Sequence, residues 1–152
     1  MYKKTKFLVK SNINYLKHNI ANLFDKGNKY VVLLYHRVIN DEIDDLVDNY
    51  ILTDEFYDQI KFLNRNYDII KFDDIKSYNS LNNIGIIITF DDGYIDNYIN
   101  AYPILKNENN SAMFFVLSKY INSNRPIWDR EICILYKYYL ENKKEYEFKK
   151  IF

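Results

Sequence analysis

The sequence predicts an α/β fold built on parallel strands, arranged as an open sheet or a barrel. The first reason is three runs of apolar, β-forming residues, at 30–35, 84–90 and 111–117, which are typical of strands buried on both faces. The second is that stretches with a helical spacing of apolar residues alternate with these runs. Such alternation is the pattern of parallel α/β proteins, and 152 residues suffice for one ordinary domain with a sizeable core.

The N-terminal part begins with a predicted amphipathic helix over residues 5–25, and Gly27 suits the left-handed position after its end. The apolar face of this helix is narrow and has no Trp, which favours packing on protein over lying on a membrane surface. The strand predicted over residues 30–35 ends at His36. Residues 39–52 are acidic and are predicted to form a loop.

The next helix is predicted to begin at Thr53, which can cap it, and to end near Asn64. Its apolar side chains recur at i, i+4 and i+7, namely Phe56, Ile60 and Leu63. A short strand over residues 67–72, followed by a short helix and a loop, leads to the apolar run at 84–90.

A further helix is predicted after that run, with an apolar face made of Ile95, Tyr98, Ile99 and Tyr102. Pro103 is expected to bend or end it. Residues 111–117 form the fourth predicted strand, also buried. A loop containing Pro126 leads to a last helix, whose apolar face consists of Ile132, Leu135, Tyr136 and Tyr139.

The composition excludes several classes of protein. Lys and Arg together number 21, as do Asp and Glu, and this balance argues against nucleic-acid binding. Cys133 is the only cysteine, so no internal disulfide or cysteine metal cluster can form, and we expect it to be buried on a helix. No apolar run approaches the roughly 18 residues of a membrane span. The stretch KFLVKSNINYL has too many polar residues for a signal-peptide core, so a cytoplasmic protein is expected.

Two adjacent carboxylates, Asp91 and Asp92, stand where the apolar run 84–90 ends. In parallel α/β folds ligands bind at the carboxyl ends of the strands, where His36 is also expected. Neighbouring carboxylates repel each other unless something positive lies beside them, and a divalent metal is the simplest solution. One Asp would then bind the metal, while the other takes a proton from water as a general base. The alternative is helix capping, because a helix is predicted to begin near Tyr94.

The stretch TFDDGYIDNY, residues 89–98, resembles the first motif of the polysaccharide deacetylases, the carbohydrate esterase family that includes the chitooligosaccharide deacetylases. The segments LLYHRV (33–38) and TDEFYDQIKFL (53–63) resemble the family's opening strand and the helix that follows it. Residues 101–121 resemble the helix and strand after the motif. The segment IWDREI (127–132) is similar to one found in bacterial members linked to surface-polysaccharide assembly.

The resemblance covers residues 30–135 and implies a distorted (β/α) barrel, a divalent metal, usually zinc, and hydrolysis of an N-acetyl or O-acetyl group on a sugar polymer. Such a protein is a hydrolase of carbon–nitrogen bonds other than peptide bonds. By the family's motif, Asp91 is the general base and Asp92 a metal ligand. His36 and Tyr94 are expected to contact the substrate. The alternatives are that His36 satisfies local backbone groups and that Tyr94 packs as an aromatic side chain.

The sequence departs from the family after residues 111–117, where the family completes its metal site with two histidines in an H-[ST]-x-x-H pattern. This chain has only His18 and His36, and both precede the first motif. We therefore expect the N-terminal part of a deacetylase domain, an incomplete barrel and an incomplete metal site. The expected organisation is an N-terminal helix over residues 1–29 and a partial deacetylase domain over residues 30–152.

Several explanations of this departure stay open: a fragment, a truncated reading frame, a degenerate copy, or a separate chain that supplies the rest. Hydrolysis by this chain alone is expected to be weak or absent. Unpaired strands would expose apolar surface, which predicts self-association or a complementing C-terminal fragment as a partner besides the polysaccharide. The alternative function is a non-catalytic carbohydrate-binding or assembly protein on the same fold. A phosphate-transferring enzyme is disfavoured, because adjacent aspartates do not meet the D-x-D spacing that such enzymes use.

Overall fold

The structure is a computed structural model that describes residues 13–24, 30–42, 49–78 and 84–142. The chain divides into two compact units, Met1–Ile43 with Asp48–Val116, and Asp44–Val47 with Leu117–Phe152. Each unit is considered by itself. The predicted domain division at residue 30 stays a prediction. None of the described helices is long and apolar enough to cross a membrane.

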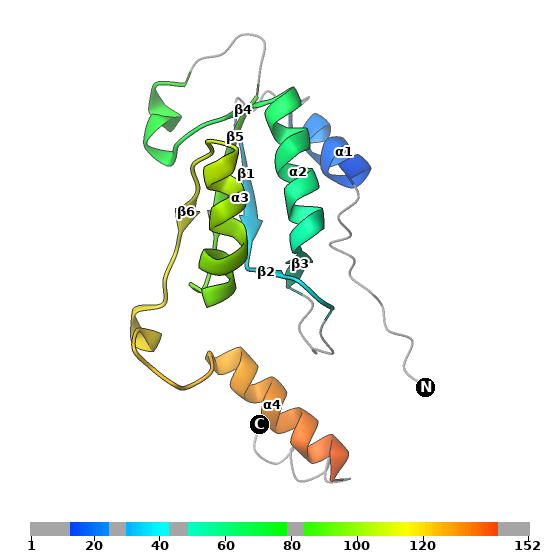
Figure 1. The fold of residues 1–152 in the computed structure, drawn as a ribbon, viewed down its shortest axis with the longest axis vertical. Helices are drawn as coiled ribbons and strands as arrows, with labels where there is room; N and C mark the ends of the chain where they lie inside the picture. Colours follow the sequence, from blue (N-terminus) through cyan, green and yellow to red (C-terminus); the bar gives the residue numbers. More distant parts are fainter. Residues whose placement is uncertain (1–12, 25–29, 43–48, 79–83, 143–152) are drawn as a thin grey trace. The chain divides into compact units, whose positions relative to one another are not determined.

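The first unit is built on a parallel sheet centred on strand β5 (Gly85–Phe90) (Figure 1). Strand β1 (Tyr30–Tyr35) pairs with β5 along all six residues. On the other side of β5, strand β4 (Asp68–Ile69) pairs with its beginning and strand β6 (Met113–Phe114) pairs with its end. All of these pairings are parallel, which confirms the predicted fold class.

A second, two-stranded parallel sheet lies just beyond β1 and was not predicted. Strand β2 (Arg37–Ile39) pairs with strand β3 (Tyr50–Leu52), and β3 lies within the stretch 39–52 that the sequence predicts to be a loop. Val38 and Ile51 face each other in this pairing and are 0% and 2% exposed, respectively. Three-residue strands are too short to show a period, so the acidic residues around them dominated the prediction.

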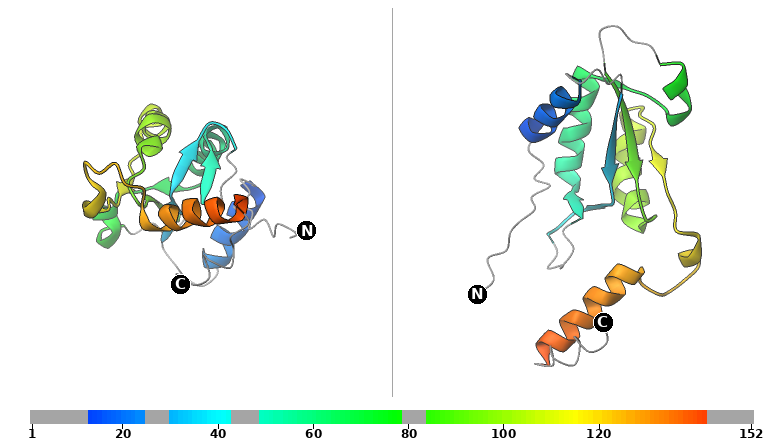
Figure 2. Two further views of the ribbon diagram at one scale, coloured as in Figure 1. Left: turned by 90° about the horizontal axis from the view of Figure 1, so that it is seen from below. Right: turned by 180° about the vertical axis from the view of Figure 1, so that it is seen from behind.

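Two helices pack beside β1. Helix α1 (Ile13–Phe24) lies within the predicted span 5–25, and contacts α2 and β1 (Figures 1 and 2). Gly27 lies outside the described residues. Helix α2 (Thr53–Asn66) begins where predicted and extends two residues past Asn64. Its buried residues include the three predicted ones, Phe56, Ile60 and Leu63.

Thr53 does not cap helix α2, contrary to the prediction. The N-cap position is held by Leu52, which still belongs to β3, so Thr53 is the first helical residue. The Thr53 hydroxyl instead donates a hydrogen bond of 2.8 Å to the Asn40 side chain. The Leu52 backbone N–H donates to the Glu55 carboxylate at 3.4 Å. Asp54 and Glu55 in the first turn suit the positive end of the helix dipole.

The helical segment 95–107 follows the two carboxylates and turns a different face to the core than the sequence predicts. It contains a π-helical turn, Asn97–Ala101, and then helix α3, Tyr102–Asn107. The predicted core face, Ile95, Tyr98, Ile99 and Tyr102, is 43–70% exposed. The buried residues are Asp96, Asn97, Ala101 and Leu105. The prediction of this face was wrong because the polar residues Asp96 and Asn97 are buried in place of the apolar ones, and Asp96 is paired with Arg37.

Pro103 does not end this helix. It stands in the first turn of α3, where a missing backbone N–H is tolerated. The π-helical turn directly before it is closed by the Tyr102 N–H, which donates to the Asn97 carbonyl oxygen. The irregularity expected at Pro103 therefore lies in the preceding turn, and the helix runs on to Asn107.

Aromatic rings from three elements form the centre of the core. The ring centroids of Tyr35 and Phe56 are 5.1 Å apart, those of Tyr35 and Phe90 5.5 Å, and those of Phe56 and Phe90 5.7 Å. The buried Tyr35 hydroxyl donates a hydrogen bond of 2.7 Å to the Gln59 side chain. Burial raises the pKa of Tyr35 above its ordinary value. Because Tyr35 and Phe90 end β1 and β5, this cluster holds the carboxyl ends of both strands in place.

The outer strands are less buried than the sequence predicts. On β1, Val32 and Leu34 are 50% and 55% exposed, so this strand is buried on one face only. At β6 and just after it, Phe114, Phe115 and Val116 are 39–56% exposed. Among the described residues no strand pairs with the outer edge of β1 or of β6. These strands therefore form an incomplete (β/α) barrel, preceded by an amphipathic helix, as the sequence predicts.

The second unit contains a short 3-10 turn, Ser118–Tyr120, and helix α4 (Trp128–Glu141). The backbone N–H of Trp128 donates to the Tyr120 hydroxyl oxygen at 3.1 Å. The Trp128 side chain is 64% exposed, and Cys133 is half-buried on α4. Leu135 and Tyr136, on the predicted apolar face, are 40% and 37% exposed, so this face is only partly covered.

Candidate active site

The candidate site lies at the carboxyl end of β5, the most buried of the described strands. Every residue of β5 is buried, and Ile86, Ile88 and Phe90 are 0% exposed. Asp91 and Asp92 follow directly and are half-buried. The Asp91 N–H donates a hydrogen bond of 2.9 Å to the Tyr35 carbonyl oxygen, which extends the pairing of β1 and β5 by one residue. The structure thus presents both carboxylates at the carboxyl edge of a parallel sheet.

The backbone turns sharply just after Asp91. Asp92 and Gly93 both have left-handed backbone angles, with φ of 72° and 71°. A Cβ atom added at Gly93 would lie 3.0 Å from a methyl carbon of Val116, so glycine suits this position by conformation and by space. For Asp92 the left-handed conformation costs about 1–2 kcal/mol. Strain of this kind in a non-glycine residue often marks a functional turn.

Tyr94 stands directly before the first helical residue, Ile95, at the position of a helix cap. Neither Asp91 nor Asp92 occupies that position. The sequence alternative, in which these carboxylates serve chiefly as helix caps, therefore has less support than their place at the strand end.

His36 lies at the neighbouring strand end. The register pairs Tyr35 with Phe90, so the next residues along the two strands are His36 and Asp91. His36 is half-buried and leads directly into β2. Parallel strands lie about 4.8 Å apart, so the backbone brings these two residues side by side. Whether His36 contacts a substrate stays a prediction.

Tyr94 lies on the far side of the turn and is half-buried. The centroid of its ring is 5.0 Å from the guanidinium carbon of Arg37, a cation–π contact. This contact supports the packing alternative for Tyr94, and the predicted contact with substrate stays a prediction. Arg37 follows His36, so the contact also joins the two segments that carry the candidate residues.

Three polar residues beside the site were not singled out from the sequence: Arg37, Asp96 and Asn100. Asp96 is 8% exposed and accepts a hydrogen bond of 2.9 Å from Arg37 Nε and one of 3.1 Å from the Val38 N–H. The Asn100 side chain donates to the Val38 carbonyl oxygen at 2.7 Å. The sequence signal was the spacing of Asp96 and Asn100, which places both polar side chains on one helix face.

Beside them, the Asn97 side-chain amide is 2% exposed and has no hydrogen-bond partner among the described residues.

The residues present do not fit a complete metal centre. Within the described ranges, no group of three or more His, Cys, Asp or Glu side chains is arranged to hold a metal ion. A catalytic zinc ion normally has three protein ligands. Asp91, Asp92 and His36 therefore do not form such a centre by themselves.

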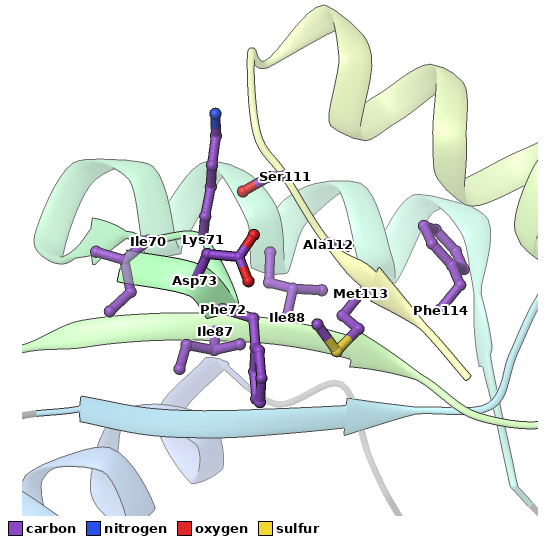
Figure 3. A pocket seen from close by; sticks show the side chains of 10 residues that line it. All are labelled: Ile70, Lys71, Phe72, Asp73, Ile87, Ile88, Ser111, Ala112, Met113 and Phe114. Carbon is purple, nitrogen blue, oxygen red and sulfur yellow. The ribbon is translucent and has the colours of Figure 1, made fainter. Parts of the chain in front are cut away.

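Two cavities open elsewhere, where β4 and β6 diverge along the same edge of β5. One has a volume of 370 Å³ and is lined by residues that follow β4, by residues of β5 and β6, and by the residues just before β6 (Figure 3). Figure 3 shows Phe72, Ile87 and Met113 pointing to one side of this gap and Lys71 to the other. The second cavity, of 590 Å³, adjoins α3. Neither is lined by Asp91, Asp92, His36 or Tyr94, so these cavities mark a gap in the sheet and not the candidate site.

Comparison with known proteins shows which family this chain resembles. Residues 79–144 match the family model described as polysaccharide deacetylase. YxkH of Bacillus subtilis (strain 168), which is named as a polysaccharide deacetylase, is 40% identical over 47 residues, or 31% of this chain and 17% of that protein.

Two solved structures are similar as well. IcaB from Ammonifex degensii has a TM-score of 0.56 and 27% identity, covering 65% of this chain and 42% of that one. A de-N-acetylase from Aggregatibacter actinomycetemcomitans has a TM-score of 0.56 and 26% identity, covering 66% of this chain and 43% of that one. The resemblance to polysaccharide deacetylases is thereby confirmed. The chain spans less than half the length of each of these three relatives.

Proposed function

We propose, from its resemblance in sequence and fold to part of a polysaccharide deacetylase, that this chain supplies the carboxylate part of a deacetylase site. The substrate is a polysaccharide or oligosaccharide with N-acetyl or O-acetyl groups. The observation that supports this proposal is the placement of Asp91 and Asp92 by a fully buried strand, beside the strand end that carries His36. One of the similar solved structures is that of a de-N-acetylase.

The proposed reaction needs a base, and Asp91 is the proposed one. For an N-acetyl group, the oxygen of a water adds to the carbonyl carbon while the Asp91 carboxylate accepts a proton from that water. The carbon–nitrogen bond then breaks as the proton held by Asp91 passes to the nitrogen, and a free amine and acetic acid, which ionises to acetate, are released. General-base catalysis contributes about 10²–10⁴-fold to such a rate. His36 and Tyr94 are the proposed substrate contacts.

Asp92 is the proposed protein ligand for a divalent metal, zinc by family resemblance. Since the described residues do not complete a metal centre, the remaining ligands must come from another segment or another chain. That source is also the proposed partner. It would cover the exposed face of β1, at Val32 and Leu34, and the exposed residues after β6, at Phe115 and Val116. A second copy of this chain is the alternative occupant of the same surface.

The test joins this chain to the C-terminal part of a related de-N-acetylase and measures acetate release from an N-acetylated oligosaccharide. We expect release by the joined protein and a loss of at least 10²-fold in Asp91→Asn. Asp58→Asn, which removes an exposed carboxylate on α2, is the matched control and should keep full activity. Full activity of the Asp91→Asn protein would rule out the proposed base.

A non-catalytic carbohydrate-binding or assembly protein is the second candidate, and the lack of a three-residue metal cluster among the described residues is compatible with it. Calorimetric titration of this chain with an acetylated oligosaccharide separates the two functions. Binding that is unchanged by a chelator, together with no acetate release by the joined protein, would favour the non-catalytic function.

A further inference from the structure

A buried carboxylate joins the two segments that carry the candidate site residues. Asp96 lies in the first turn of the helical segment after Asp91 and Asp92, and its side chain is 11% exposed. One of its oxygens accepts a hydrogen bond from Arg37 Nε at 2.9 Å, and the other accepts from the Val38 N–H at 3.1 Å. Both oxygens of Asp96 therefore bind the segment that follows His36.

The same helix contacts that segment a second time, one turn further on. Asn100 donates its side-chain N–H to the Val38 carbonyl oxygen at 2.7 Å. Asp96 and Asn100 thus bind the N–H and the carbonyl of one residue, Val38. The guanidinium of Arg37 also lies over the ring of Tyr94, 5.0 Å from its centroid. These contacts fix the orientation of Arg37–Val38 against the start of the helix.

The candidate residues lie between two fixed points. On one side, the Asp91 N–H donates to the Tyr35 carbonyl oxygen at 2.9 Å. On the other side, Asp96 holds Arg37 and Val38. His36 is the one residue between Tyr35 and Arg37, and Asp92–Ile95 form the stretch between Asp91 and Asp96. Both stretches are therefore tied at each of their ends.

The Arg37–Asp96 ion pair is partly buried, with side chains 23% and 11% exposed, and such a pair is weak evidence for stability, because removing two charges from water costs about as much as their attraction returns. Its hydrogen bonds do define a geometry, because charged donors and acceptors bind at short, directed distances. The Arg37–Asp96 pair lies beside the candidate site residues, where geometry affects the rate. A displacement of about 1 Å in a reacting group can lower a rate 10²-fold.

We propose that Asp96 is a positioning residue of this site, which holds the strand end carrying His36 against the turn carrying Asp91 and Asp92. The positioning role rests on the proposed function, but it predicts a local structural effect that can be measured without substrate. The pair between Lys61 and Glu108, 3.0 Å apart, provides the matched control, because none of the candidate site residues takes part in it.

The test compares Asp96→Asn with Glu108→Gln in the full chain, by hydrogen exchange and by NMR of the imidazole groups. The chain has two histidines, so His18 on α1 serves as an internal reference for His36. In Asp96→Asn we expect the His36 signal to shift or broaden while the His18 signal stays in place. Exchange at residues 91–94 should also accelerate at least 10-fold relative to the centre of β5. In Glu108→Gln both readouts should equal those of the unaltered chain.

Two further points make the test decisive. If Asp96→Asn does not fold, Arg37→Lys keeps the positive charge but lacks the planar guanidinium, and we expect the same pattern with a smaller amplitude. A purely structural role would lower the urea midpoint and leave the signals of His36 and of residues 91–94 unchanged, and that result would overturn the proposal. A joined protein that releases no acetate would count against the proposed function alone, because neither readout here depends on activity.

Discussion

Strands β5 and β6 are neighbours that run in the same direction, yet they differ in almost every property. β5 pairs on both of its sides and is buried at each of its six residues. β6 pairs over two residues with β5 alone, and Phe114 is 39% exposed. The difference teaches that an apolar run is buried only when both its edges and both its faces find partners. β5 can therefore hold the candidate site rigidly, whereas β6 is available to a partner.

The largest effect expected from this difference concerns Phe90 and Phe115. Phe90 is 0% exposed, and the centroid of its ring lies 4.8 Å from that of Phe114. Its ring also contacts the rings of Tyr35 and Phe56. Phe90→Ala should lower the free energy of unfolding by about 3–5 kcal/mol, because it leaves a cavity in the core. Phe115 is 48% exposed, so Phe115→Ala should lower the free energy of unfolding by about 1 kcal/mol or less.

Urea denaturation of the two variants measures both values. Similar losses at the two positions would mean that the end of β6 and the residue after it are as well packed as β5, and the contrast between the two regions would then be wrong. A loss at Phe115 that appears only when a complementing segment is added would sharpen it, because it would show that the partner covers this residue.

A smaller effect is expected where the turn after β5 meets the end of β6. Gly93 has φ of 71°, and a Cβ atom there would lie 3.0 Å from a Val116 methyl carbon. Gly93→Ala should therefore lower the free energy of unfolding by about 1–2 kcal/mol for the left-handed backbone, plus a cost for the contact. In the double variant with Val116→Ala, only the contact part should be recovered. Full recovery would show that the backbone angle carries no cost, and no loss in Gly93→Ala would show that the turn does not need glycine.

The contrast between β5 and the rest of the molecule also holds for what could be predicted from the sequence. The run that forms β5 and the two carboxylates after it are contiguous, so one short stretch contains the whole signal for strand, edge and turn. Helix α2 was equally plain, because Phe56, Ile60 and Leu63 repeat at helical spacing. Both are local patterns, and local patterns are what a single sequence displays.

The parts that could not be predicted depend on partners distant in the sequence. Asp96 is buried because Arg37, 59 positions earlier, supplies the compensating charge. With this polar residue turned inward, Tyr98 and Ile99 of the same helix are turned outward, against the ordinary preference of such residues. The pairing of β2 with β3 is likewise non-local. In the candidate site, the carboxylates were therefore predictable, and the Arg37–Asp96 contact that ties them to β2 was not.

The smallest effect expected concerns the helix layer that covers β5. Lys61 of α2 donates a hydrogen bond of 3.0 Å to Glu108, just after α3. This hydrogen bond lowers the pKa of Glu108 below 4.5 and raises the pKa of Lys61 above 10.5. For Glu108 the stabilisation is therefore present above pH 4.5 and lost as the pH falls through the lowered pKa. For Lys61 it is present below pH 10.5 and lost as the pH rises through the raised pKa.

The pair is a surface pair, so its contribution to stability should be the least of the effects considered. The difference in urea midpoint between the unaltered chain and Glu108→Gln should be greatest near pH 7 and should shrink towards zero at pH 3. High salt should also reduce it, because exposed charges are screened. A difference that stays constant with pH and salt would mean that Glu108 acts through packing and not through its charge. The cover of β5 would then depend on apolar burial alone, as the contrast between β5 and β6 already suggests for the strands themselves.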